Sequence, residues 1–356
     1  MSELELRGGI RAAPHPGATP QERRALRFAA DTCGRDADPE HIARSARAEE
    51  ADGIESALVV SASAWPDAWL VASWALASTT TLRVALAHRI GTTAPTVAAR
   101  ALQTLDRLSG GRAGVHLILG SSDDDVRRDG DTLGKPERYE RAAEFLDLFT
   151  RTLHAREPFD AGGPHWPVRD AWSGLPPSRP ELSFAGSSDA GIALAARYAD
   201  VYGLVPDTPD GIRATVARVR GEAAVHGRTL RIWMHARLLL GESDDAAHAA
   251  AERLVEDARG LDGLVGDPQW IARVAPPGAP RPTAAEQVSA GLQRATIGAP
   301  DTVARELYAL REAGVDVLQL AAPAEDERDR ELRRALIAEL RCLEAVRGAA
   351  PATAAR

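Results

Sequence analysis

Gly186, Ser187 and Ser188 stand where a short apolar run meets an alanine-rich helical pattern, in the stretch ELSFAGSSDAGIALAARYAD. One interpretation is a helix cap, in which Ser187 or Ser188 accepts hydrogen bonds from the first free N–H groups of the helix. The other is an anion site, because a helix N-terminus carries free N–H groups and partial positive charge, and two hydroxyls add donors. The residues by themselves leave both interpretations open.

His235 and Arg237 lie two residues apart in the run RIWMHARLLL, which has the composition of a strand. A spacing of two places both side chains on one face of a strand. Burial of such a pair is unfavourable unless the pair has a task, so we expect a functional role. His235 could act as an acid or a base near pH 7, and Arg237 could bind an anionic group.

His116 lies in a third candidate stretch, GVHLILG. Strand alternation puts His116 and Ile118 on one face and Val115, Leu117 and Leu119 on the other. A histidine that points into the mouth of a barrel could bind a ligand, but it could also be an interior histidine with satisfied hydrogen bonds.

The elements that would position these residues alternate between apolar strands and amphipathic helices, which predicts a parallel sheet of the α/β class. Eight strands fit a closed (β/α)8 TIM barrel better than an open doubly wound sheet. The predicted strands are Leu4–Ile10, Ser56–Val60, Leu82–Ala87, Val115–Leu119, Leu182–Ala185, Val201–Leu204, Ile232–Leu240 and Val315–Leu320. The helices between them include Pro39–Asp52, Thr96–Leu108, Pro136–His154, Pro209–Gly227 and Asp301–Ala313.

Three excursions interrupt this alternation after strands one, four and seven, at residues 11–38, 155–180 and 262–300. The second contains PFDAGGPHWPV and is expected to form a β-hairpin. The first and third would lie at the carboxyl ends of the strands, where barrel loops carry function. We expect one domain over residues 1–345 and a flexible tail over residues 346–356.

Composition excludes several functions for this chain of 356 residues with net charge -8. It has no basic block for nucleic acid and no apolar run of membrane-spanning length, and its first residues, MSELELRGG, contain no apolar core of signal-peptide length. Cys33 and Cys342 give neither a disulfide framework nor metal spacing, so a reduced cytoplasmic compartment is the default. Lys135, the single lysine, lies in a polar loop, which argues against Schiff-base chemistry. No His-x-His follows the first strand, so a metal-dependent hydrolase is disfavoured.

Five stretches in register resemble the bacterial luciferase-like flavin monooxygenases, most closely the alkanesulfonate monooxygenase branch. They span roughly residues 40–320 in order. The stretches are APTVAARALQTLDRLSGGRAGVHLILGSS, ERYERAAEFLDLF, FAGSSDAGIALAARYADVY, VRGEAAVHGRTLRI and IGAPDTVARELYALREAGVDVLQL.

The resemblance implies a barrel that binds flavin mononucleotide (FMN) at the carboxyl ends of its strands. It favours the phosphate interpretation of Gly186, Ser187 and Ser188. It also places Tyr139 of the ERY pattern near the phosphate or the flavin, although Tyr139 could simply pack its helix on the barrel. Relatives carry asparagine at the position of His116, close to the flavin ring, so His116 would hydrogen-bond the flavin or gate dioxygen.

The chain departs from the sulfonate branch where substrate would bind. Trp65 stands in place of a cysteine and is expected to form an apolar wall of the pocket, or to serve packing alone. A tyrosine that follows the eighth strand in that branch is absent here. The arginine- and glycine-rich lid of that branch is also shortened, which leaves Arg294 as a candidate substrate contact. That branch has arginine before histidine in the seventh strand, the reverse of His235 and Arg237. Trp65 beside Arg237 suggests a substrate with an apolar part and an anionic group.

The resemblance predicts a two-component flavin monooxygenase that uses dioxygen and reduced FMN from a separate NAD(P)H:flavin reductase, because the chain has no GxGxxG for a nicotinamide. A homodimer or homotetramer is expected. The alternative is a deazaflavin-dependent hydride-transfer enzyme on the same barrel. A non-catalytic flavin-binding relative is a third possibility, against which the His235 and Arg237 pair argues.

Overall fold

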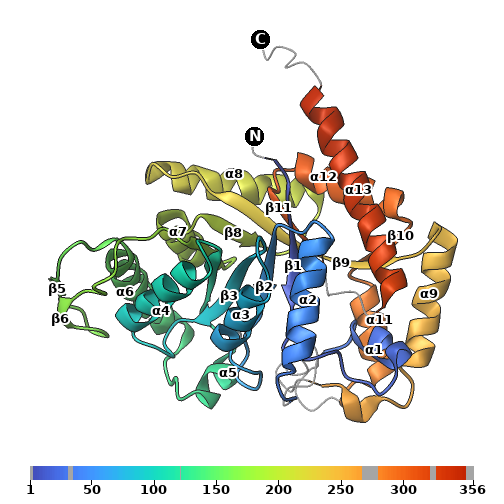
Figure 1. The fold of residues 1–356 in the computed structure, drawn as a ribbon, viewed down its shortest axis with the longest axis horizontal. Coiled ribbons are helices and arrows are strands. Elements are labelled where there is room, and N and C mark those ends of the chain that lie inside the picture. The colour runs from blue at the N-terminus through green and yellow to red at the C-terminus, as the bar shows by residue number, and fades with distance from the viewer. Residues whose placement is uncertain (1–2, 31–34, 121, 267–279, 321–325, 350–356) are drawn as a thin grey trace.

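The computed structural model describes residues 3–30, 35–120, 122–266, 280–320 and 326–349. Eight parallel strands close into a barrel in the order β1, β2, β3, β4, β7, β8, β9 and β11, and β11 pairs again with β1 (Figure 1). The predicted (β/α)8 barrel is therefore confirmed. Its strands are β1 (Glu5–Ile10), β2 (Ser56–Val59), β3 (Arg83–Arg89), β4 (Ala113–Ile118), β7 (Glu181–Ala185), β8 (Val201–Leu204), β9 (Arg231–Leu240) and β11 (Val317–Leu320).

Helices follow the strands and cover the outside of the barrel, as Figure 1 shows. Their apolar faces and the outward side chains of the strands form one continuous hydrophobic core. The long helices are α2 (Pro39–Ala51), α3 (Ala68–Ala77), α4 (Pro95–Leu108), α6 (Lys135–His154), α7 (Asp189–Tyr198), α8 (Pro209–Val225), α9 (Asp244–Asp257), α12 (Pro300–Glu312) and α13 (Glu327–Ala349). Helix α5 (Asp123–Arg128) is a short helix after β4.

The excursions contain structure of their own. The second forms the antiparallel hairpin of β5 (Phe159–Ala161) and β6 (Val168–Ala171), as predicted. The first contains helix α1 (Pro20–Leu26), and the third contains a 3-10 turn (Asp262–Leu264), α11 (Ala284–Leu292) and β10 (Ala295–Gly298). Strand β10 pairs with the end of β9 beyond the barrel, which the sequence analysis did not anticipate.

Two excursions that are far apart in sequence share a second hydrophobic core. Leu26 and Phe28 from the first excursion pack with Leu239 of β9, Leu254 of α9 and Val288 of α11. This core holds the first excursion at the carboxyl end of β9.

The expected boundary at residue 345 falls inside a helix. Helix α13 continues to Ala349, which contradicts a tail that begins at residue 346, and residues 350–356 lie outside the described residues. Gly348 and Ala349, the last two residues of α13, offer no apolar periodicity by which the sequence could place this end. Cys33 also lies outside the described residues, and Cys342 is an exposed free thiol.

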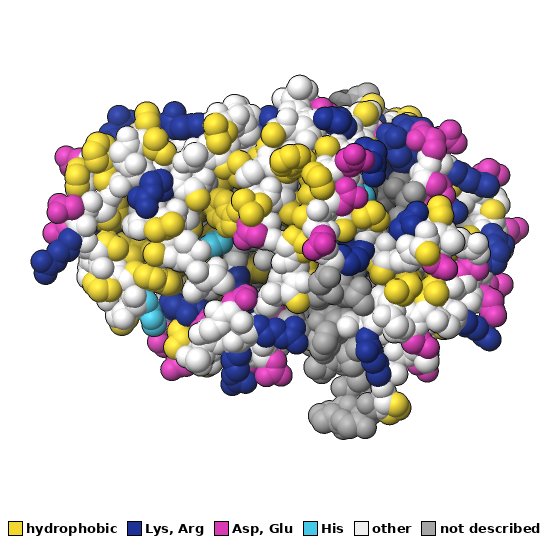
Figure 2. All heavy atoms as spheres, turned by 60° about the horizontal axis from the view of Figure 1, so that its bottom comes forward, with side chains coloured by type: hydrophobic (Ala, Val, Ile, Leu, Met, Phe, Trp, Pro, Cys, Tyr) yellow, Lys and Arg dark blue, Asp and Glu magenta, His cyan; other side chains and the backbone are white. Residues whose placement is uncertain are grey.

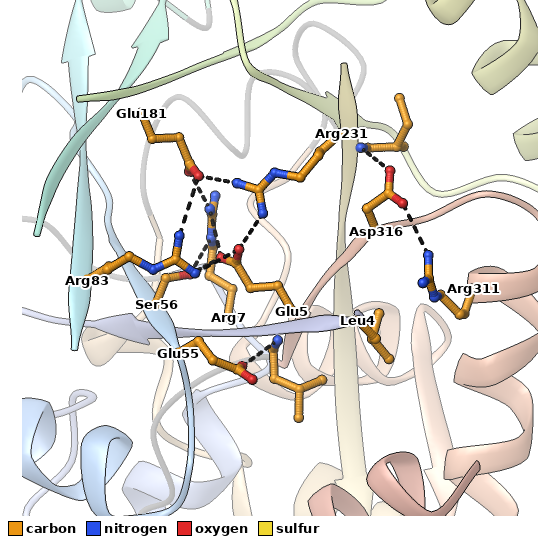
Figure 3. A network of polar contacts seen from close by, with 12 residues as sticks. Leu4, Glu5, Arg7, Glu55, Ser56, Arg83, Glu181, Arg231, Arg311 and Asp316 are labelled. Atoms are coloured by element: carbon orange, nitrogen blue, oxygen red, sulfur yellow. Dashed lines mark hydrogen bonds and ion pairs between the residues drawn. The ribbon is translucent and has the colours of Figure 1, made fainter. Parts of the chain in front are cut away.

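A charged layer closes the barrel at the amino ends of its strands (Figure 3). Glu5, Arg83, Glu181 and Arg231 are the first residues of β1, β3, β7 and β9, which alternate around the barrel. Four side chains from alternate strands are the usual composition of a barrel layer. The fully buried Arg7 binds Glu181 at 2.7 Å and joins this layer from above.

The same layer keeps Glu5 charged. Burial acts to raise the pKa of Glu5, but the charges of Arg7 and Arg83 outweigh it, and the pKa falls to about 2. Arg231 adds a further ion pair to Glu5 at 2.5 Å. This end of the barrel is thus a closed ionic floor, and a ligand has to approach from the carboxyl ends of the strands.

Candidate active site

His116 lies inside the barrel above the floor, with 6% of its surface exposed. Its Nδ1 is 2.9 Å from the hydroxyl of Ser183, the neighbouring residue on β7. Its ring meets Trp233 of β9 edge to face, with centroids 5.0 Å apart. Burial, and then the charge of Arg7, lower the pKa of His116 to about 3, so the imidazole is neutral at pH 7.

A cavity of about 260 Å³ opens at the carboxyl ends of β1, β2, β9 and β11. Figure 2 brings this end of the molecule forward and shows hydrophobic side chains over much of it, with Lys and Arg side chains between them. The cavity is lined by Gly9, Ile10, Arg11, His15, Arg27, Phe28, Leu58, Val60, Trp65, His235, Arg237, Leu238 and Gln319. No acidic residue is among these described lining residues.

His235 and Arg237 both line this cavity, as the spacing of two on β9 predicts. Both are half-buried. Burial, and then the charge of Arg237, lower the pKa of His235 to about 4, so it is neutral at pH 7. Burial, and then the charge of Arg294, also lower the pKa of Arg237. Arg237 forms no hydrogen bond or ion pair with the described residues.

Trp65 lines the same cavity from the loop between β2 and α3. The guanidinium of Arg11 lies over its ring, 5.6 Å from the centroid. Phe28 of the first excursion adds a second aromatic side chain to the lining. The cavity therefore combines apolar walls with positive charge. Arg294 is exposed and does not line it, although it is near enough to influence Arg237.

The turn after β7 forms a separate group of donors. Ser188 is the N-cap of α7, and its Oγ accepts a hydrogen bond from the Gly191 N–H at 3.2 Å. The hydroxyls of Ser188 and Tyr139 lie 2.7 Å apart. Ser187 is exposed, and the Gly186 carbonyl accepts a hydrogen bond from the Tyr202 hydroxyl at 2.9 Å. The cap interpretation is thus correct for Ser188, and it is compatible with an anion site.

The donors of this turn are not all used within the protein. Whichever of Ser188 and Tyr139 donates to the other, one O–H hydrogen of the pair remains available. The N-terminus of α7 adds partial positive charge beside it. Gly186 has no side chain at this point, and a Cβ there would lie 3.3 Å from Gly191 and 3.6 Å from the Tyr139 hydroxyl.

The structure thus groups the predicted residues in three places. The cavity is lined by His235, Arg237 and Trp65. The turn after β7 contains Gly186, Ser187 and Ser188, and Tyr139 of α6 contacts it. His116 lies in the barrel interior.

Trp233 and Phe28 are residues of the site that were not predicted from the sequence. Trp233 carried a usable signal, because Arg231, Trp233, His235 and Arg237 follow one another at period two. Phe28 carried none, because it lies in a polar excursion without periodicity.

The described residues contain neither a metal centre nor a membrane-spanning helix. Within them, no group of three or more His, Cys, Asp or Glu side chains is placed to hold a metal ion. No helix in the described ranges is long and apolar enough to cross a membrane.

Solved structures with the same fold include enzymes with different cofactors. Riboflavin lyase RcaE, solved with modified FMN and riboflavin, has a TM-score of 0.75 and 16% identity over 98% of this chain and 93% of that chain. EDTA monooxygenase EmoA from Chelativorans sp. BNC1 has a TM-score of 0.73 and 18% identity, and the match covers 98% of this chain and 95% of EmoA. An F420-dependent secondary alcohol dehydrogenase in complex with an F420-acetone adduct has a TM-score of 0.70 and 17% identity, and the match covers 95% of this chain and 99% of the dehydrogenase.

These likenesses are too distant to show more than the fold, and they do not single out a sulfonate branch. The family is shown by a sequence model of luciferase-like monooxygenases, which matches residues 10–317. That range includes every strand of the barrel from the end of β1 to the start of β11. The chain therefore belongs to the luciferase-like monooxygenase family.

Proposed function

We propose that this chain is the oxygenase of a two-component flavin-dependent monooxygenase. It would use reduced FMN and dioxygen to oxidise a small organic molecule that has an apolar part and an anionic group, such as a sulfur-containing acid. The observation that carries this proposal is Arg237. A half-buried arginine without a carboxylate partner among the described residues lies in a cavity beside Trp65, at the end of the barrel where loops carry function.

The turn after β7 suits the phosphate of FMN. A phosphate needs several donors and positive potential, and the N-terminus of α7 together with Ser187, Ser188 and Tyr139 offers both. The solved structure of RcaE, which has the same fold, contains a modified FMN. These residues therefore fit the group, and they would hold its phosphate.

FMN, when bound in reduced form, supplies the activation of dioxygen. The chain supplies the surroundings. Arg237 would hold the anionic group of the substrate, and Trp65 and Phe28 would exclude water from its apolar part. His235 is neutral at pH 7 because burial lowers its pKa to about 4, so it can accept a hydrogen bond at its free ring nitrogen, and it does not serve as the acid near pH 7 that the sequence suggested.

A separate NAD(P)H:flavin reductase would deliver the reduced FMN. We also propose that the chain works in the cytoplasm as a homodimer or homotetramer.

The experiment that tests this proposal combines thermal shift and dioxygen consumption. Reduced FMN, added under anaerobic conditions, should raise the melting temperature more than oxidised FMN does. With a supplied reductase, a panel of sulfonates, sulfones, thioethers and amines should then reveal a compound that is oxidised in proportion to the dioxygen consumed. Short alkanesulfonates should be poor substrates, because Trp65 and the shortened lid differ from that branch. Failure of reduced FMN to bind would overturn the proposal.

A deazaflavin-dependent hydride transfer is the second candidate. The likeness to an F420-dependent alcohol dehydrogenase over 95% of this chain favours it. The two functions differ in their cofactor and in their use of oxygen. Tighter binding of oxidised F420 than of oxidised FMN, together with substrate oxidation in which oxidised F420 takes up the hydride in the absence of dioxygen, would select this second function.

A further inference from the structure

Ser183 and His116 form a buried pair that the proposed chemistry has not used. They are register neighbours on β7 and β4, and both point into the barrel. Ser183 is 1% exposed. On the other side of the imidazole, the Trp233 ring fixes its plane, and Gly203 leaves the space for that ring, since a Cβ there would lie 2.8 Å from it. The imidazole thus has one packed orientation.

The contacts of Ser183 indicate which nitrogen of His116 carries the proton. The Ser183 hydroxyl donates to the carbonyl oxygen of Val115 at 3.3 Å, and a carbonyl oxygen can only accept. A hydroxyl has one hydrogen, so it cannot also donate to His116. The 2.9 Å contact is then a hydrogen bond from the Nδ1–H of His116 to the Ser183 oxygen.

We infer that Ser183 holds His116 as the Nδ1–H tautomer, so that Nε2 offers a lone pair inside the barrel to an N–H group of the bound flavin ring. Ser183 is then a positioning residue for the cofactor. Nε2 has no partner among the residues that the structure describes. The imidazole is neutral at pH 7, so this lone pair is free to accept. The flavin half of the inference rests on the proposed function, whereas the tautomer does not.

The tautomer can be measured without any cofactor. In flavin-free protein with 15N-labelled histidine, NMR at pH 7 should show a protonated Nδ1 and an unprotonated Nε2 for His116, assigned by the signals that H116N lacks. In S183A the two tautomers should mix. S45A is the matched control, because Ser45 also contacts a histidine, His41, but on α2 at 3.4 Å, and it should leave the His116 signals unchanged.

Two results would overturn the positioning role. A protonated Nε2 in the parent protein would mean that Ser183 donates to His116 instead. Unchanged His116 signals in S183A would mean that Ser183 does not select the tautomer. Melting curves of the same samples show whether each variant is folded, and S183T, which keeps the hydroxyl, should preserve the parent tautomer if S183A proves unstable.

Flavin binding tests the second half. The dissociation constant of reduced FMN should rise about twofold in S183A for an equal mixture of tautomers, because only the Nδ1–H form presents Nε2 as an acceptor, and it should stay unchanged in S45A. Equal affinity of S183A and the parent would overturn the acceptor role of Nε2. If reduced FMN binds to neither protein, the proposed function fails, while the NMR result still decides the tautomer.

Discussion

Arg237 differs from the other buried arginines of the barrel. Arg7 is fully buried and binds Glu181 at 2.7 Å, and Arg311 is 1% exposed and binds Asp316 at 3.1 Å. Breaking a buried charge pair is strongly unfavourable, which explains why these partners are present. Arg237 lacks such a partner among the described residues, and an anionic ligand in the cavity would supply it.

Replacement of Arg237 should therefore affect catalysis more than folding. R237M should keep the parent's affinity for reduced FMN and lose turnover of the best compound in the panel by roughly 10²-fold, as for a positioned charged group. R237K should retain more turnover than R237M, because it keeps the charge. R294M is the matched control, since Arg294 is exposed outside the cavity, and its turnover should stay near that of the parent. Normal turnover in R237M would place substrate binding elsewhere.

The same substitution should change the titration of His235. Burial is the main reason for its low pKa, and the charge of Arg237 is the second. In R237M the pKa of His235 should rise above its value of about 4, but it should stay below 6.5 because the burial remains. NMR titration of labelled histidine measures both values. An unchanged pKa of His235 would mean that the charge of Arg237 does not act on it.

At the scale of elements, the start of α7 has two roles that one experiment can separate. Ser188 caps α7 and, in the proposed function, contacts the FMN phosphate. S188A should lower the stability of the protein by about 1 kcal/mol, as for a lost N-cap. It should also weaken reduced-FMN binding by about 1 kcal/mol or more, as for a lost charge-assisted hydrogen bond.

Thr208 offers a matched control for this prediction. It caps α8 with the same geometry, accepting from the Gly211 N–H at 3.2 Å, the distance that Ser188 has to Gly191. T208A should lose similar stability and keep its affinity for reduced FMN. Equal flavin affinity in S188A and T208A would leave Ser188 with capping alone.

The elements of the barrel could be predicted because each carries a strong periodic signal. Strand β9 is a ten-residue run in which Arg231, His235 and Arg237 share one face, and α4 has an apolar stripe along its whole length. The excursions were harder. Helix α1 has only seven residues, although Thr19 and Glu22 form a capping box that the sequence does reveal. Strand β10 has four residues, and its pairing with β9 depends on tertiary contacts that no local pattern encodes.

At the scale of the whole molecule, the barrel explains which parts of the site were predictable. Period two on β9 correctly placed His235 and Arg237 together, since their separation is local. The pairing of His116 with Ser183 requires the order of β4 and β7, with the 155–180 excursion between them. Phe28 reaches the cavity only because two distant excursions pack on one another. Contacts of this kind follow from topology, and one sequence does not specify them residue by residue.

The whole molecule should also lose stability in mild acid, because several histidines are buried in neutral form. Burial is the first cause that lowers the pKa of His88 to about 4, of His116 to about 3 and of His235 to about 4, from 6.5. In the unfolded chain these groups take up a proton as the pH falls through 6.5, whereas in the folded protein they do not. Protons then favour the unfolded state, so stability is complete above pH 6.5 and declines from there toward pH 4.

Urea unfolding at pH 7.5, 6.0 and 5.0 measures this decline. Each such histidine contributes up to about 1.4 kcal/mol to the loss of stability per pH unit below its unfolded pKa.

H88Q should make the stability fall less steeply with pH, by the contribution of one histidine. Glutamine does not titrate, but it can still accept the hydrogen bond that Trp69 donates to His88 at 3.2 Å. H248Q is the control, because His248 is exposed on α9. The window between pH 6.5 and 5 lies above the ordinary pKa values of carboxylates, so the histidines dominate the decline there. A flat stability profile across that window would mean that water or protons reach these side chains in the folded protein, and the barrel interior would then be more open than its packing indicates.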